Sequence, residues 1–98
     1  MSLIINIYYT GENDSARKFA NEMISSGIVD RVRNEKGNEK YEYFFRMDDP
    51  KTVLLIDKWQ DEKALDIHHK SEMMKEIAKL REKYNLKLRV EKYKEWEN

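Results

Sequence analysis

The sequence contains no cysteine, and this absence removes several classes of chemistry at once. Disulfide bonds, thiolate nucleophiles and cysteine-ligated metal sites are all excluded. An excess of either charge is missing too, because 19 Lys and Arg residues balance 19 Asp and Glu residues. Nucleic-acid binders draw much of their affinity from neutralising phosphates, so this balance argues against a nucleic-acid partner. It also removes the electrostatic argument for binding to a membrane surface.

Long apolar runs and targeting signals are absent as well. No apolar stretch approaches the ~18 residues that a membrane-spanning helix requires. Residues 1–7 lack the basic segment and the small-residue cleavage site of a signal peptide. We therefore expect a cytoplasmic protein without a membrane partner. A chain of 98 residues has room for one hydrophobic core, so a single domain over residues 1–98 is expected.

What the sequence does contain is a clear order of periodic segments. Strands are expected at residues 2–10, 41–47, 52–59 and 86–93. Amphipathic helices are expected at residues 13–27 and 61–84, the second as two helices or as one kinked helix. Residues 28–40 are ambiguous apart from a turn near Gly37. In the last strand, alternation predicts three inward side chains, Leu86, Leu88 and Val90.

The order β-α-β-β-α-β is typical of the ferredoxin-like α+β fold, an antiparallel sheet with its helices on one face. Several strands are apolar on both sides. In residues 2–10, for example, Ile5 and Tyr9 share one face while Ile4 and Tyr8 share the other. An exposed apolar face of this kind usually marks an interface. The economical arrangement is a two-fold homodimer in which the sheets pack face to face.

Three segments together resemble the antibiotic biosynthesis monooxygenase family. They are the loop and aromatic strand of residues 33–44, the turn Asp48-Asp49-Pro50 with the strand that follows it, and the run from Trp59 to His68 that contains Ala64-Leu65. The resemblance implies a dimeric α+β barrel with a pocket between sheet and helices in each subunit. Several members of that family oxidise quinol-like or polyketide aromatics with O2 and use no metal or flavin. Others degrade haem, isomerise small carbonyl compounds or have no known activity, so the fold alone does not give the reaction.

Two departures from the family pattern narrow the choice. Many members carry a second helix histidine where this chain has Ser71-Glu72-Met73. Residues 76–81 also lack the histidine that ligates iron in the haem-degrading members. Haem degradation is therefore disfavoured, and no metal or cofactor is expected.

Two polar residues are the candidates for catalysis. His68 lies one helical turn after Ala64, where a neutral imidazole can accept a phenolic proton. The alternative is a packed histidine that bonds to backbone. Asn6 is the strongly polar residue of an apolar strand, so its amide is either satisfied by neighbouring backbone, offered to a ligand, or placed at a solvent-facing rim. His69 points about 100° away from His68 and is expected at the surface.

Aromatic and thioether side chains supply candidate walls for a pocket that stacks on a substrate ring. They are Tyr8, Tyr41, Phe44, Trp59 and Met73, each of which is alternatively a core residue. The leading hypothesis is a cofactor-independent monooxygenase that oxidises a small aromatic, quinol-type or polyketide-like substrate with O2. His68 or a pocket water would accept the phenolic proton, and Asn6 would hydrogen-bond an oxygen of the resulting anion. The alternatives are a non-catalytic dimer that binds a small molecule and an isomerase of a small carbonyl compound.

Overall fold

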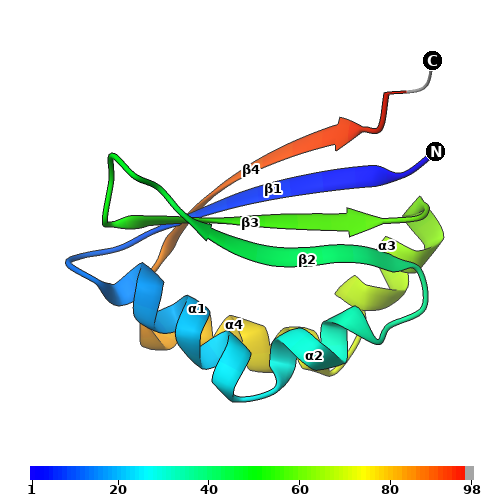
Figure 1. Cartoon of the computed structure of the whole chain (residues 1–98). Coiled ribbons are helices and arrows are strands. Elements are labelled where there is room, and N and C mark those ends of the chain that lie inside the picture. The colour runs from blue at the N-terminus through cyan, green and yellow to red at the C-terminus, as the bar shows by residue number, and fades with distance from the viewer. Residues whose placement is uncertain (97–98) are drawn as a thin grey trace.

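The chain folds into a four-stranded sheet with every helix on one side of it (Figure 1). The computed structural model describes residues 1–96, so residues 97 and 98 of the expected domain lie outside the described part. Along the chain the elements are β1 (Leu3–Thr10), α1 (Ser15–Ser25), α2 (Ile28–Arg33), β2 (Asn38–Phe45), β3 (Thr52–Trp59), α3 (Glu62–His69), α4 (Met73–Lys83) and β4 (Lys87–Lys94).

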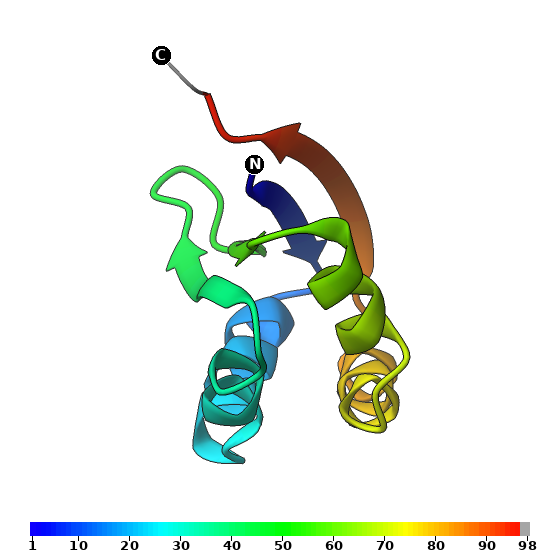
Figure 2. The same ribbon diagram turned by 90° about the vertical axis from the view of Figure 1, so that its right-hand side faces the viewer.

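The strand order is β2-β3-β1-β4, and each neighbouring pair is antiparallel. This is the ferredoxin-like α+β arrangement, and the predicted fold class is confirmed. Viewed along the strands, the helices form two columns on the same side of the sheet, α1 with α2 and α3 with α4 (Figure 2). We call the side of the sheet that carries the helices the covered face and the other side the open face.

The ambiguous stretch after the first helix contains a helix of its own. Gly27, at the end of the first expected helix, has a left-handed φ of 84° and is followed directly by α2. Val29 and Val32 of this short helix are buried in the core. The strand β2 then begins at Asn38, earlier than the predicted residue 41.

The core lies between the covered face and the helices. In β3 the side chains alternate as expected for a strand with one buried side. Leu55 and Trp59 are fully buried on the covered face, where the Tyr9 ring of β1 packs against Phe19 of α1 at 4.8 Å. Their neighbours along β3, such as Ile56, are only partly buried on the open face.

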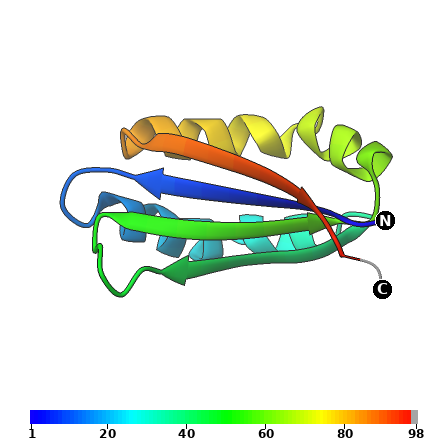
Figure 3. The ribbon, with the colours of Figure 1, turned by 90° about the horizontal axis from the view of Figure 1, so that it is seen from above.

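The prediction of buried side chains in the last strand is wrong. Leu88 and Val90 do alternate toward the covered side, yet they are 37% and 48% exposed. The reason is visible from above the sheet, where α3 and α4 lie beside the β4 edge rather than beneath it (Figure 3).

The glycine turn just before β2 packs against the start of α3. Gly37 has a left-handed φ of +89°, and its carbonyl accepts a hydrogen bond from the Gln60 N–H at 2.8 Å. A Cβ placed on Gly37 would lie 2.5 Å from the Cβ of Ala64. Glycine is therefore required here both by the backbone angle and by the close approach of α3.

Candidate functional site

His68 lies near the end of α3 and faces the core. The helix starts at Asp61, whose Oδ1 accepts a hydrogen bond from the Ala64 N–H at 2.9 Å. From this start, two turns of helix carry His68 inward, and the residue is only 3% exposed. Its Nδ1 lies 2.6 Å from Oε2 of Glu35, which stands in the loop between α2 and β2. The imidazole side group is thus held by a carboxylate rather than by backbone.

Trp59 connects the imidazole to a second carboxyl group. The rings of Trp59 and His68 pack 4.7 Å apart at an angle of 30°. On its other side, the indole Nε1–H donates a hydrogen bond of 2.6 Å to Oδ1 of Asp57. These four residues, Glu35, Asp57, Trp59 and His68, form what we call the acid–base cluster.

Asp57 is a buried acid in an apolar setting. It shares the covered face with Leu55 and Trp59 and is 4% exposed. Burial raises its pKa to about 7; the Glu35 charge acts in the same direction, while the hydrogen bond from Trp59 acts against it. The carboxyl group is therefore divided between its acid and its base form near neutral pH.

Three phenols of the neighbouring strands lie on the same face of the sheet as this carboxyl group. Tyr9 comes from β1, and Tyr41 and Tyr43 come from β2, with the last two rings edge-to-face at 6.0 Å. Burial raises the pKa of all three hydroxyls above the usual tyrosine value, so they remain neutral. The Tyr43 hydroxyl is buried and meets no partner of good hydrogen-bond geometry within residues 1–96.

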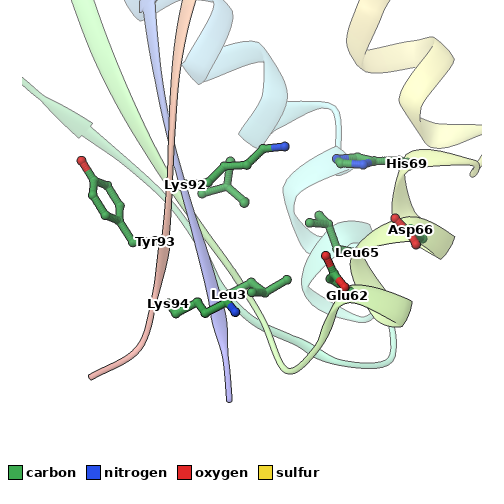
Figure 4. Close-up of a pocket in the computed structure, with 9 residues that line it drawn as sticks. Leu3, Glu62, Leu65, Asp66, His69, Lys92, Tyr93 and Lys94 are labelled. Carbon is green, nitrogen blue, oxygen red and sulfur yellow. The ribbon is translucent and has the colours of Figure 1, made fainter. Parts of the chain in front are cut away.

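A pocket of about 330 Å³ opens between β1, β4 and α3 (Figure 4). Its lining residues are Leu3, Ile5, Glu62, Leu65, Asp66, His69, Lys92, Tyr93 and Lys94. In the close-up, Lys92 extends from the strand side toward His69 on the helix side. Burial lowers the pKa of His69, and the nearby His68 lowers it further.

An aliphatic wall of three side chains lies between the pocket and the acid–base cluster. Ile5 lines the pocket and is the cross-strand partner of Asp57, and Leu3 stands in the same relation to Trp59. Leu65 completes the wall one helical turn before His68. These three side chains therefore lie between the pocket and the cluster, and no residue of the cluster lines the pocket itself.

The sheet divides the residues predicted for the site into two groups. His68, Tyr41, Trp59 and Met73 belong to the covered side, where Met73 packs partly buried against the core. Asn6, Tyr8 and Phe44 belong to the open face, because their neighbours Tyr9 and Tyr43 face the helices. One subunit therefore does not bring Asn6 to His68.

The open-face group has contacts of its own. Asn6 lies between Ile56 and Glu91 in the sheet, and its buried Oδ1 has no hydrogen-bond partner within the described chain. The Arg89 guanidinium lies 4.0 Å over the Tyr8 ring. Phe44 is 41% exposed.

Sequence reasoning missed three residues of the site. Asp57 could have been recognised from the sequence, because it is a single acid at one of the alternating buried positions of β3. Glu35 carried none, since its partner His68 lies 33 positions away. His69 is exposed as predicted, but its place at the pocket depends on how β4 packs beside α3.

Metal and membrane sites are not found in residues 1–96. No group of three or more His, Asp or Glu side chains in this part of the chain is arranged to hold a metal ion. No helix there is both long and apolar enough to cross a membrane.

The sequence profile of the antibiotic biosynthesis monooxygenase family matches residues 2–80. The chain belongs to this family. A curated Bacillus subtilis protein named "Putative monooxygenase YcnE" is 25% identical over 69 residues, which cover 70% of each chain.

Solved structures with low sequence identity to this chain share its fold. A Deinococcus radiodurans protein described as a "putative antibiotic biosynthesis monooxygenase" superposes with a TM-score of 0.84 at 16% identity, covering 98% of this chain and 94% of that one. SnoaB, a cofactor-independent oxygenase from Streptomyces nogalater, gives a TM-score of 0.80 at 10% identity, covering 99% and 95% of the two chains.

Proposed function

We propose that this protein is a monooxygenase that uses O2, without a cofactor, to oxidise a small aromatic substrate of quinol or polyketide-like type. The observation that carries the proposal is the acid–base cluster, in which one imidazole and two carboxyl groups are held around one indole in an apolar interior. In such surroundings the imidazole can accept the hydroxyl proton of a bound phenol, and the apolar walls exclude water from the anion that forms. The description of SnoaB as a cofactor-independent oxygenase is a second support.

In the proposed reaction the substrate enters through the pocket and passes the aliphatic wall of Leu3, Ile5 and Leu65. Its ring stacks against Trp59 and Tyr41, with Met73 on the helix side. His68, oriented at Nδ1 by Glu35, accepts the substrate's hydroxyl proton at Nε2. The resulting phenolate has the electron density to react with O2 directly.

The proposed assembly is a homodimer that packs the open faces of two sheets together. On the two edge strands of this face, Phe44 and Tyr93 are 41% and 50% exposed. The two central strands contribute Ile4, Tyr8 and Ile56 to the same face. Exposed apolar side chains gathered on one face of a sheet usually mark an interface. In the dimer, Asn6 would offer its unpartnered carbonyl to the second copy or to a ligand held between the copies.

The test is oxygen uptake by purified, metal-free protein over a panel of quinols and anthrols, with the spontaneous rate subtracted. We expect uptake without added cofactor, and a loss of about a hundredfold or more in His68→Ala. Lys70→Ala, which changes an exposed residue at the end of α3, is the matched control and should keep the wild-type rate. Equal rates in wild type and His68→Ala would contradict the role of His68.

A binding protein without catalysis is the second candidate. It is favoured by the enclosure of His68, which is 3% exposed behind the aliphatic wall. Under this alternative the same aromatic compounds quench Trp59 fluorescence on binding, and none is consumed.

A further inference from the structure

The proposed oxidation has to remove two protons from its substrate, and the cluster contains two groups able to take them. A phenol with a free ring carbon reacts with O2 to give a quinone and water. One oxygen atom enters the ring and the other leaves as water, while the hydroxyl proton and the proton on the attacked carbon both leave the ring. One base accounts for the hydroxyl proton only, so the reaction calls for a second.

We propose that Asp57 is this second catalytic base, which accepts the ring-carbon proton and returns a proton to the departing oxygen. This inference rests on the proposed function. After O2 has added to the ring carbon, the peroxide takes the proton that His68 received. The C–H bond then breaks toward the Asp57 carboxylate as the O–O bond breaks, the quinone carbonyl forms, and hydroxide leaves. Protonated Asp57 gives that proton to the hydroxide, which completes one water and restores the carboxylate.

The geometry supports different proton transfers by His68 and Asp57. His68 packs on the face of the Trp59 ring, and Asp57 binds its Nε1 edge, so both groups border one bicyclic aromatic system. An aromatic substrate that stacks in the same interior would meet the imidazole and the carboxyl group at different atoms. Ile5, the cross-strand partner of Asp57, lines the pocket, so Asp57 lies one strand further into the sheet than the pocket wall.

The charged and titratable groups around Asp57 match the role of a base that also acts as an acid. From its own strand, Trp59 donates a hydrogen bond that favours the carboxylate, while Glu35 from the α2–β2 loop favours the neutral acid. From β1 and β2, the neutral phenols of Tyr9, Tyr41 and Tyr43 face it, and Arg81 of α4 acts on Tyr9. Burial dominates this balance and raises the pKa of Asp57 to about 7, where proton uptake and release are both accessible.

The test compares the pH dependence of oxygen uptake with the titration of Asp57 itself. Carboxyl-labelled aspartate followed by NMR gives the pKa of Asp57, assigned by the signal that disappears in Asp57→Asn. We expect kcat/KM of the wild type to rise through that same pKa as the carboxylate forms. Asp57→Asn keeps the shape and still accepts from the indole, but should lose about a hundredfold or more in kcat/KM and this limb of the profile.

A second variant separates Asp57 from the ionisation of the substrate. Trp59→Phe removes the hydrogen bond that lowers the pKa of Asp57, so the NMR titration and the rate profile should move to higher pH together. The pKa of the substrate is the same in both proteins, so a profile set by the substrate would not move. Asp48→Asn, at an exposed turn, is the matched control and should leave the profile unchanged.

The outcomes distinguish the two proposals. Uptake that is present in the wild type but has the same pH profile in Asp57→Asn overturns the role of Asp57 and leaves the proposed function standing. An NMR titration of Asp57 far from the rate profile overturns that role as well. No uptake above the spontaneous rate on any compound overturns the proposed function, and the role of Asp57 falls with it.

Discussion

The two faces of the sheet are built from the same strands but differ in how deeply their side chains are buried. Along β3, the covered face carries Asp57 and Trp59 in full burial, while the open face carries Ile56 and Lys58 in partial exposure. On the covered face the Asp57 carboxyl group accepts from the Trp59 indole and Glu35 pairs with His68, while the Tyr43 hydroxyl has no partner within residues 1–96. On the open face the carbonyl of Asn6 is buried without a partner.

This difference teaches that the subunit is complete on one face only. The covered face has its helices, its core and its acid–base cluster. The open face has apolar area and an unmatched polar group, as expected of a surface that meets another molecule. Chemistry and assembly are thus separated by the two-residue period of a strand. Changes on the covered face should alter the stability and reactivity of the subunit, and changes on the open face its association.

The largest contrast is expected between two aromatic truncations. Trp59→Ala removes a fully buried ring and should lower the free energy of unfolding by about 3–5 kcal/mol. Phe44→Ala, on the open face, should lower the stability of the single subunit by less than about 1 kcal/mol. Urea unfolding at low protein concentration measures both. Equal losses would show that the open face is packed within one subunit.

A pH-dependent contrast follows from Asp57. Its pKa in the folded protein, about 7, lies above the value of 3.8 for a free carboxyl group, so the folded state holds the proton more tightly. Stability should therefore fall as pH rises from about 4 to about 8, by at most about 4 kcal/mol. Asp57→Asn should remove this fall and become more stable than wild type at the upper end. Glu42→Gln, an open-face control, should keep the wild-type slope when unfolding is followed across pH.

A smaller effect is expected at the carboxylate that holds the imidazole. Glu35→Gln replaces the charged partner of the buried His68 and should cost about 1–2 kcal/mol in the free energy of unfolding. Glu76→Gln removes an exposed carboxylate that binds Arg31 in two hydrogen bonds, and we expect little change there. A cost for Glu35→Gln no greater than for Glu76→Gln would mean that the His68 pair adds nothing to the fold.

A charge placed at the centre of the open face should have the smallest effect on the stability of the subunit. It is also the most direct test of the proposed assembly. Ile56→Lys should convert a dimer into a monomer of 11.9 kDa in light scattering at micromolar concentration, with the single subunit still folded. Ile67→Lys makes the same change on α3, where the side chain is already 61% exposed, and should stay dimeric. A wild-type protein that runs as a monomer would refute the face-to-face assembly.

The regular elements could be predicted from sequence because their periods are strong. The alternation in residues 52–59 and the helical stripe that contains Phe19 both correspond to elements of the fold. The short helix α2 could not be predicted, because six residues hold less than two turns and Gly27 carries the signal of a stop. The exposure of Val90 depends on the position of α3 and α4 beside the sheet, which no local pattern contains.

The candidate site could be predicted only in part, because its contacts join residues that are far apart in the sequence. The burial of His68 follows from its place on the helix, but its pairing with Glu35 joins residues far apart in the chain. The opposite directions of Asn6 and Tyr9 also follow from alternation. Because both sides of residues 2–10 are apolar, however, the sequence does not tell which side the helices cover. Asn6 and His68 could therefore be assigned to one site although the sheet lies between them.

The turn at Gly37 gives a steric reason for the small residue in Ala64-Leu65, a pair of residues first noted for its resemblance to a family pattern. With the Gly37 backbone packed this closely on Ala64, a larger side chain at either position would push α3 away from the start of β2. Glu35 and His68 stand on the two sides of that contact, and their 2.6 Å pairing would open with it. The small residue of Ala64-Leu65 thus acts as a spacer that sets how far apart the acid and the imidazole stand. A homologue with a bulkier residue there should carry a longer loop in compensation.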